Sequence, residues 1–318
     1  MKLNDDERSR LHQILVSEGL ERHAELFETV SEACYRVFPV GEGESSSIGS
    51  SRFGGEPDLP KDFLWPGEED EEAAIFLAQI NLSDVTCEEL PREGLLSLWC
   101  WGTDAAADPV GVEAHLFDGS IPLERRSAPD PEEMCDEYLT ELEPVKVRFE
   151  RAISLGWDHP RLDGLRNAND DYYEAFDRIK KTFSDTAIGQ FLGAAVSWDG
   201  TNLYHSLALE VHDKLDCQYA PIFDSMKNYE QAIVEASKNG REWRVVDLKR
   251  NKSCVRWLIE NHDAIASEAS RWQCLLRIDS NEEMNLWIND ADPLFCFIRK
   301  QDLASRDFRR MTGRVLQS

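Results

Sequence analysis

The sequence predicts an α+β protein in which mostly antiparallel sheets form two related lobes, with helices at the periphery. Two observations carry this prediction. Apolar residues alternate with a period of two over 75–81 and 94–101, and again over 274–279 and 294–299, as is typical of strands with a buried face. Segments between these strand pairs repeat their apolar residues every three or four positions, which indicates helices.

The two strand pairs also match each other. When 76–101 is placed on 274–299 without a gap, the aligned pairs are Leu77 with Leu275, Ile80 with Ile278, Asn81 with Asp279, Leu96 with Leu294 and Trp99 with Phe297. The common spacing of strand, spacer and second strand favours an internal duplication over a coincidence between two apolar strands. Because the period is far longer than that of a solenoid repeat, it implies two lobes packed face to face.

The chain divides into a helical cap with a linker, 1–50, and a duplicated α+β domain, 51–318, whose lobes span about 51–150 and 185–310. Helices are expected near 5–19, 24–34, 130–142, 170–183, 226–239, 252–268 and 301–310. Further strands are expected near 37–40, 112–117, 145–153, 202–211 and 243–248. Loops are expected at 41–51, 58–70, 103–112, 119–130 and 157–169.

The composition limits the possible partners. Sixty-one acidic and thirty-five basic residues give a formal charge of −26, whose field repels nucleic acid and anionic membranes and attracts basic proteins. Such acidity also serves solubility alone. No apolar run is long enough to span a bilayer, and the first residues lack a signal-peptide core, so a cytoplasmic location is expected.

Cysteine usage agrees with a reducing compartment. The eight cysteines are scattered, and several lie within apolar stretches; they are residues 34, 87, 100, 135, 217, 254, 274 and 296. We expect them to be reduced and to behave as small buried apolar residues.

Two stretches carry a family resemblance. The first contains Phe53-Gly54-Gly55, Pro57, Leu59-Pro60, Trp65-Pro66 and 76–81, and the second contains 275–279, 294–298 and Asp302-Leu303. Together they resemble the YwqG-like family, soluble bacterial proteins without an agreed activity. The resemblance implies the fold but no reaction. Segment 188–193 lacks the second Gly and the Pro of the family's Leu-Gly-Gly-Tyr-Pro-like turn, which puts the contribution of that turn in doubt.

Motifs for catalysis and for cofactors are not found. The chain has no Gly-x-Ser-x-Gly elbow and no Walker phosphate loop, and the Gly41-x-Gly43 segment lacks the third glycine of a dinucleotide loop. His205, His212 and Cys217 have a spacing that metal ligands could have, but no Cys-x-x-Cys or His-Glu-x-x-His accompanies them. Asp279, Asp290 and Asp292 are better explained by a turn. We therefore expect no cofactor and no metal.

Several polar or special residues lie within apolar runs and are the candidates for ligand binding in a cleft between the lobes. They are Arg52, Gly54, Gly55, Trp65, Gln79, Asn81, Gln190, Arg277 and Asp279. The alternative is structural, because buried polar groups are routinely satisfied by hydrogen bonds, glycines by tight turns and tryptophans by core packing.

Two functions remain open. The first is a non-catalytic protein-binding role, such as an immunity or antitoxin-type protein that captures a basic partner, and the charge of −26 motivates it. The second is a small-molecule binding protein or an enzyme that uses the cleft between the lobes. A scaffold role is a third possibility.

Overall fold

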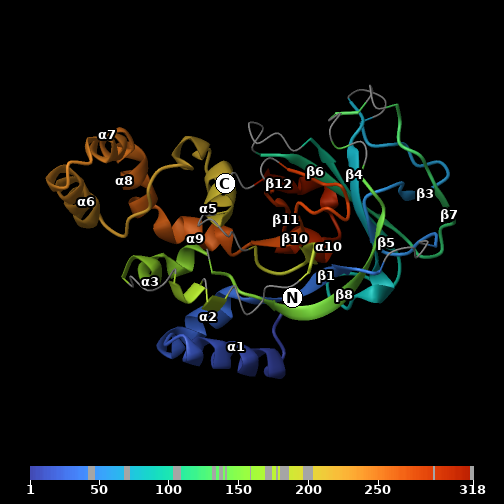
Figure 1. Cartoon of the computed structure of the whole chain (residues 1–318), viewed down its shortest axis with the longest axis horizontal. Coiled ribbons are helices and arrows are strands. Elements are labelled where there is room, and N and C mark those ends of the chain that lie inside the picture. Colours follow the sequence, from blue (N-terminus) through green and yellow to red (C-terminus); the bar gives the residue numbers. More distant parts are fainter. Residues whose placement is uncertain are drawn as a thin grey trace.

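The computed structural model describes residues 1–41, 47–67, 72–102, 109–130, 134–135, 139, 142–157, 159–168, 174–176, 178–179, 186–195, 203–288 and 291–315. Its centre is a sheet of ten strands in the order β12-β11-β10-β9-β1-β8-β2-β4-β5-β6, in which neighbours are antiparallel (Figure 1). The α+β class with a mostly antiparallel sheet is confirmed. The strands are β1 (Glu32–Pro39), β2 (Arg52–Phe53), β4 (Ile75–Asn81), β5 (Leu95–Trp101), β6 (Gly111–Phe117), β8 (Val145–Ser154), β9 (Gly189–Phe191), β10 (Trp272–Ile278), β11 (Leu294–Arg299) and β12 (Thr312–Val315).

The sheet curls until its two edges meet. Beside the edge strands β6 and β12, Val110 and Gly313 form an antiparallel bridge with backbone hydrogen bonds of 3.1 and 2.8 Å. A Cβ atom on Gly313 would lie only 2.9 Å from the Val110 carbonyl oxygen, so the close approach depends on glycine. The largest apolar cluster draws on strands from the whole sheet, including Val37, Leu96 and Ile278.

The two strand pairs that match in sequence also match in register. Gln79 pairs with Ser97 between β4 and β5, and Arg277 pairs with Phe295 between β10 and β11. Each pair has a register shift at the same place, between Phe76 and Ala78 in one and between Cys274 and Leu276 in the other. Both pairs belong to one continuous sheet, where β9, β1, β8 and β2 lie between them.

Helices cover the sheet and extend from one side of it (Figure 1). They are α1 (Asp5–Ser17), α2 (Ala24–Val30), α3 (Asp163–Ala168), α5 (Leu203–Val211), α6 (Met226–Lys238), α7 (Glu242–Arg250), α8 (Lys252–Glu260), α9 (His262–Ala269) and α10 (Lys300–Ser305). Helix α1 begins with a capping box, in which the side chains of Asn4 and Glu7 each accept the other's backbone N–H. Within the described residues, no helix has the length and apolarity needed to cross a bilayer.

Two predicted strands, at 202–211 and 243–248, are wrong, because their described residues, 203–211 and 243–248, lie in α5 and α7. Helix α5 is apolar on most of its surface, and Leu203, Tyr204 and Leu207 pack on Phe295 and Phe297 of the sheet. An element buried around much of its circumference has no helical periodicity in its sequence. In α7 only Leu248 is buried, so its valines reflect no strand face.

Other boundaries differ from the predictions. The strand expected at 37–40 begins at Glu32, so Cys34 belongs to β1 and not to the second helix. The helix expected at 252–268 is interrupted at Asn261 between α8 and α9, and the loop expected at 157–169 contains α3. The tail helix expected at 301–310 is α10 followed by a 3₁₀ helix, Phe308–Arg310. Most of the helix predicted at 130–142, and much of that at 170–183 and of the loops at 41–51 and 103–112, lies outside the described residues.

Candidate functional site

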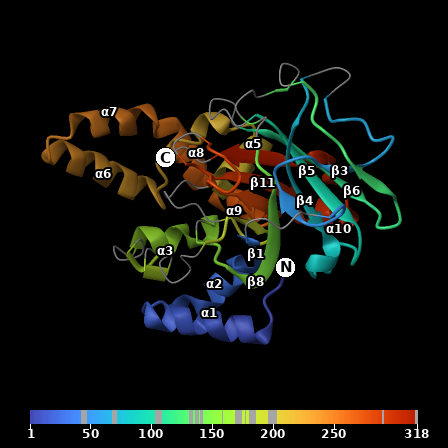
Figure 2. The same ribbon diagram turned by 45° about the vertical axis from the view of Figure 1, so that its right-hand side comes forward.

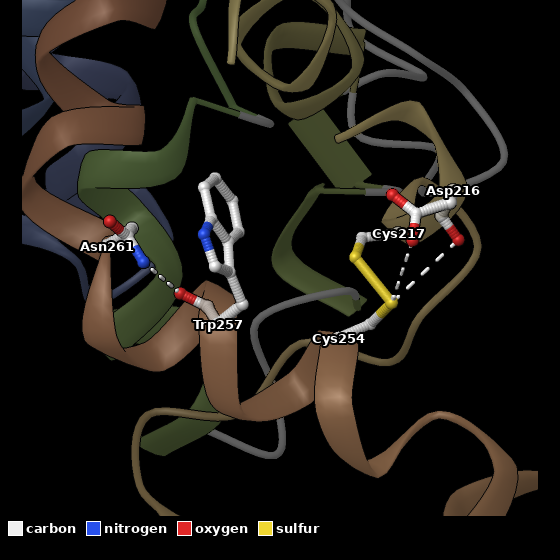
Figure 3. The surroundings of a disulfide bond; sticks show 5 residues. All are labelled: Asp216, Cys217, Cys254, Trp257 and Asn261. Carbon is white, nitrogen blue, oxygen red and sulfur yellow. Dashed lines mark hydrogen bonds between the residues drawn. A yellow bond between two sulfur atoms is a disulfide. The ribbon is translucent and has the colours of Figure 1, made fainter. Parts of the chain in front are cut away.

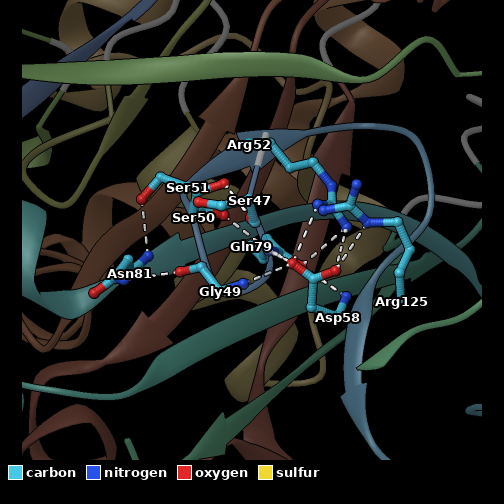
Figure 4. Close-up of polar contacts among 9 residues, drawn as sticks. All are labelled: Ser47, Gly49, Ser50, Ser51, Arg52, Asp58, Gln79, Asn81 and Arg125. Atoms are coloured by element: carbon cyan, nitrogen blue, oxygen red, sulfur yellow. Dashed lines mark hydrogen bonds and ion pairs between the residues drawn. The ribbon is translucent and has the colours of Figure 1, made fainter. Parts of the chain in front are cut away.

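A buried ion pair joins Arg52 of β2 to Asp58 (Figure 4). The two guanidinium nitrogens of Arg52 lie 3.2 and 3.3 Å from the Asp58 carboxylate oxygens, and the residues are only 1% and 0% exposed. Asp58 begins β3 (Asp58–Pro60), which pairs with β7 (Leu123–Arg125) and places Asp58 opposite Arg125. Arg125 Nε donates to Asp58 Oδ1 at 3.0 Å, so one carboxylate serves two arginines.

Gln79 completes this network. The pairing of β2 with β4 places Gln79 directly opposite Arg52. Its amide oxygen accepts from the Asp58 backbone N–H at 2.9 Å, and its amide nitrogen donates to Asp58 Oδ2 at 2.7 Å and to the Ser50 carbonyl at 2.8 Å. The Gly49 N–H adds a further hydrogen bond to Asp58 Oδ2, at 2.9 Å. Together these contacts anchor β3 and the 49–51 segment to the sheet.

The pKa shift of Asp58 keeps its carboxylate ionised at neutral pH. Burial by itself would raise the pKa of Asp58, but hydrogen bonds from Arg125, Gln79 and Gly49 and the charge of Arg52 lower that pKa overall. Burial lowers the pKa of Arg52, and the charge of Asp58 opposes this shift. A carboxylate with a lowered pKa that is held by two arginines is a poor general acid or base near pH 7. The network is suited to a structural role.

The glycine pair and Trp65 also have structural surroundings. Gly54 and Gly55 have φ angles of +65° and +68°, and added Cβ atoms would lie 2.4 Å from the Glu143 carbonyl oxygen and 2.6 Å from Pro144 Cβ. The chain itself therefore fills the space next to this turn. Trp65 is 2% exposed, donates from Nε1 to the Ala74 carbonyl at 2.8 Å and meets the Trp99 ring edge-on.

The remaining candidates form a second group on the other half of the sheet. Gln190 on β9 pairs with Arg277 on β10, and Arg277 binds Asp279 through two hydrogen bonds of 2.6 and 2.8 Å. The Gln190 amide nitrogen donates to the carbonyls of Leu192 and Ala194. Strands β1 and β8 separate this group from Arg52, Gln79 and Asn81. The structure therefore brings the candidates together as two separate groups.

A pocket of about 610 Å³ lies beside the first group. Asn81 forms part of its wall, where its side chain donates to the Gly49 carbonyl and its backbone N–H donates to Ser51 Oγ. Ser51 Oγ in turn donates to Asp84 at 2.6 Å. The lining combines hydroxyl, amide, acidic, basic and aromatic groups; it comprises Val40, Ser47, Ile48, Gly49, Ser50, Ser51, Asn81, Asp84, Lys146, Val147, Arg148 and Phe149.

Sequence reasoning selected Arg52, Gln79 and Asn81 because they interrupt apolar strands, and it missed Asp58, Arg125 and the pocket residue Asp84. Asp58 and Arg125 lie in segments that read as irregular, 67 residues apart. The Asp58-Leu59-Pro60 stretch has no apolar alternation that would have revealed a short strand. No pattern within either segment points to the other.

The expectation of eight reduced cysteines is wrong for one pair. Cys217 and Cys254 form a disulfide with their Cα atoms 5.1 Å apart, next to Asp216 (Figure 3). Cys217 ends the 3₁₀ helix Leu215–Cys217, and Cys254 lies in α8, which packs against it. A separation of 37 residues carries no signal for this pairing.

His205, His212 and Cys217, whose spacing could suit metal ligands, do not form a ligand cluster. His205 is buried and lies 3.0 Å from Asp163 Oδ2, whereas His212 packs against the Trp257 ring. Among the described residues, the one group with ligand-like proximity is Asp216, Cys217 and Cys254, and its two sulfur atoms are joined in the disulfide. A disulfide sulfur is not the thiolate that metals bind.

Four of the other described thiols are poorly activated. Burial raises the pKa of Cys34 and Cys296 to about 12, and it raises that of Cys274 as well. The pKa of Cys87 is also raised to about 12, by burial and by its hydrogen bond to Glu89. A reactive cysteine requires the opposite shift, because the thiolate is the nucleophile.

Comparison with known proteins gives a family and no activity. None of the curated proteins compared with the chain matches it. The profile of a family described as a domain of unknown function, DUF1963, matches residues 51–314, from β2 to β12. This match spans most of the chain, and the protein therefore belongs to the DUF1963 family.

Proposed function

We propose that the protein is a non-catalytic binding protein that captures a basic partner, as an immunity or antitoxin-type protein does. The observation that carries the proposal is an exposed tryptophan among acidic residues. Trp287 is 54% exposed, and Glu282 and Glu283 are exposed in the 282–285 turn that precedes it. The Glu143 backbone N–H donates to the Met284 carbonyl at 2.8 Å. This contact places Glu143, a third exposed acidic residue, next to the turn. We call Glu143, Glu282, Glu283 and Trp287 the acidic patch.

The acidic patch combines the two features that a basic partner requires. Carboxylates at the rim accelerate encounter with a cationic surface, and a large aromatic side chain supplies apolar contact once the surfaces meet. The formal charge of −26 also attracts a basic partner over a longer range. Binding of this kind weakens as ionic strength rises, because salt screens the charges over about 10 Å at 0.1 M.

Two further observations support binding rather than catalysis. The polar side chains that the sequence singles out are engaged in hydrogen bonds within the chain, as Arg52, Gln79, Asn81, Gln190 and Arg277 illustrate. The described thiols with shifted pKa values are shifted upward, away from nucleophilic reactivity.

The test measures binding of a labelled peptide by fluorescence anisotropy. The probe is an amphipathic peptide of about 20 residues with leucines at helical spacing and lysines elsewhere. Glu282→Lys/Glu283→Lys should weaken binding about tenfold or more at low ionic strength, and Trp287→Ala should weaken it about fivefold. The control Asp6→Lys/Glu25→Lys makes the same change in net charge on α1 and α2, at residues that are also exposed.

An equal loss of affinity in both double variants would show that net charge alone attracts the peptide, and it would overturn the proposed patch. The natural partner would then be sought by pull-down from the source cell at low and high salt. Recovery of no protein, or salt-insensitive capture of an uncharged one, counts against the proposal.

The second candidate is a small-molecule binding protein or enzyme, and the pocket of about 610 Å³ beside Asn81 favours it. This volume suits a metabolite-sized ligand, and Ser51, Asp84 and Lys146 offer polar groups in a lining that also contains Phe149. A thermal-shift screen with nucleotides, sugars and amino acids tests this candidate. Stabilisation that is lost in Asp84→Asn supports it, and a flat screen removes it.

We also propose that the chain arose by internal duplication and is a YwqG-like protein of the cytoplasm. The shared register of β4–β5 and β10–β11 supports two units of five strands each. In chain order, the first unit contains β1, β2, β4, β5 and β6, and the second contains β8, β9, β10, β11 and β12. Strand β6 lies on β5 with His115 opposite Ser97, and β12 lies on β11 with Arg314 opposite Phe295, at matching places. In this arrangement the first strand of each unit lies in the other unit's half of the sheet. Strand β1 is next to β9, and β8 is next to β2, which links the two related lobes into one sheet.

A further inference from the structure

Helices α6 and α7 form a hairpin that projects away from the sheet (Figures 1 and 2). The Tyr229 hydroxyl of α6 donates to the Leu248 carbonyl of α7 at 2.9 Å, and both side chains are buried together with Val255 of α8. The hairpin belongs to the long connection from β9 to β10, whereas β2 and β4 are joined by residues 54–74 alone. The hairpin is thus a well-packed addition to the sheet.

The outer face of α7 exposes two large apolar side chains. Trp243 is 69% exposed and Val246 is 67% exposed, and both point away from the buried Leu248 because of their positions on the helix. Residues three apart on a helix are neighbours, so the pair forms a continuous apolar strip. Adjacent exposed apolar residues, one of them tryptophan, are typical of interaction surfaces.

The segment that carries this strip has a net positive charge in a protein that is otherwise strongly acidic. Residues 238–256 contain seven lysines and arginines and two acidic residues, a net charge of +5 that leaves −31 for the rest of the chain. Lys249 and Arg250 continue the exposed face beyond Val246, and Arg241 lies just before the helix. None of these three cations has an ion pair with a described residue, whereas Arg244 pairs with Asp247 at 3.2 Å.

We propose that the outer face of α7 binds an acidic amphipathic segment of a partner protein. Its apolar side chains would contact Trp243 and Val246, and its carboxylates would pair with Arg241, Lys249 and Arg250. Charge complementarity selects this partner. A neutral segment would leave the cations unmatched, and a long nucleic acid or an anionic bilayer would extend toward a body that carries −31. A short acidic segment contacts only the hairpin.

The experiment uses the full chain and a fluorescein-labelled amphipathic peptide of about 20 residues, with leucines at helical spacing and glutamates elsewhere. Its binding is measured by anisotropy at low and high ionic strength. Trp243→Ala should lower the affinity about fivefold, and Lys249→Glu/Arg250→Glu should lower it at least about tenfold at low ionic strength. The matched control is Tyr219→Ala, which removes another exposed aromatic side chain, outside both proposed surfaces, and should leave the affinity unchanged.

Each alternative has its own outcome. Failure of the glutamate peptide to bind, or equal binding to wild type and Trp243→Ala, overturns the proposal. Tighter, Trp243-dependent binding of duplex DNA or of vesicles with phosphatidylserine would also overturn it and assign the face to a polyanion or a membrane. Circular dichroism of each variant confirms that the hairpin is intact. Loss of binding to the lysine peptide of the acidic patch has no bearing here, because that patch is a different surface.

Discussion

Gly54 and Leu192 have nearly the same positive φ angle at matching places in the two halves of the sheet. Their φ angles are +65° and +62°, and their amides donate to the carbonyls of Leu77 and Leu275 at 2.8 and 2.9 Å. Each follows a strand that ends in phenylalanine, Phe53 of β2 or Phe191 of β9. The positive φ angle therefore recurs although the residue type does not. At position 54 the nearby Glu143 carbonyl oxygen leaves no room for a Cβ atom, so glycine is required there.

Gly54→Ala should destabilise the protein by at least about 2 kcal/mol, because a left-handed non-glycine residue costs about 1 kcal/mol and a backbone clash adds to it. The new Cβ would lie 2.4 Å from the Glu143 carbonyl oxygen. Urea unfolding measures the loss. Gly164→Ala is the control, because no atom lies within 4 Å of its Cβ position in α3, and helix propensity predicts an unchanged or slightly higher stability. Equal effects of the two substitutions would contradict the turn geometry.

Asp58→Asn should cost about 3–5 kcal/mol of folding free energy, because it leaves the buried Arg52 without its counter-charge. Asp62→Asn removes the same charge four residues later at an exposed position and should change stability by less than about 0.5 kcal/mol. Chemical denaturation of both variants gives the comparison. A loss below about 1 kcal/mol for Asp58→Asn would mean that water or rearrangement compensates Arg52.

The Asp58 network should also make stability depend on acid pH. The folded pKa of Asp58 is lower than its ordinary value of 3.8, so the unfolded chain takes up the proton first as pH falls. The stabilisation is therefore fully present above about pH 4–5 and is lost as pH decreases through the folded pKa. The stability difference between wild type and Asp58→Asn, followed from pH 7 to acid, should shrink only below this range. A difference that instead changes between pH 6 and 8 would exclude Asp58 as its source.

Loss of the Cys217–Cys254 disulfide should lower stability by about 3–4 kcal/mol, as expected for a cross-link that closes a loop of this size. The bond closes 37 residues and joins α8 to the 3₁₀ helix before α6. Cys254→Ser should unfold at a lower urea concentration than wild type, and reductant should shift wild type to the same midpoint. Thiol titration of the unfolded chain without and with reductant provides the check. If reductant exposes no additional thiols, the two cysteines are reduced in solution.

Several features could be predicted from local sequence. The strand pairs at 75–101 and 272–299, with their common spacing, follow from period-two alternation, which depends only on neighbouring residues. The α1 and α6 helices follow from their apolar spacing and caps for the same reason. The side chains of Arg52, Gln79 and Arg277 stood out because a polar group in an apolar strand needs a partner.

The partners of Arg52 and Gln79 depended on contacts between distant segments. Asp58 and Arg125 meet because β3 pairs with β7, and Cys217 meets Cys254 because two helical segments pack together. Helix α5 was misread as a strand because it is buried around much of its circumference, which hides the helical period. Helix α7 was misread because its valines suggested a strand, although only Leu248 is buried.

The sequence by itself determined the acidic charge, the strand pairs and their common spacing, since each is a property of composition or of neighbouring residues. Only the tertiary structure decided that these pairs share one curled sheet closed at Val110 and Gly313. It also decided that Arg52 and Gln79 share one buried network with Asp58, and that Arg277 and Asp279 pair in a second, half-buried group. The physical reason is that strand order and side-chain partners depend on the burial of surfaces from distant segments, which no local pattern records.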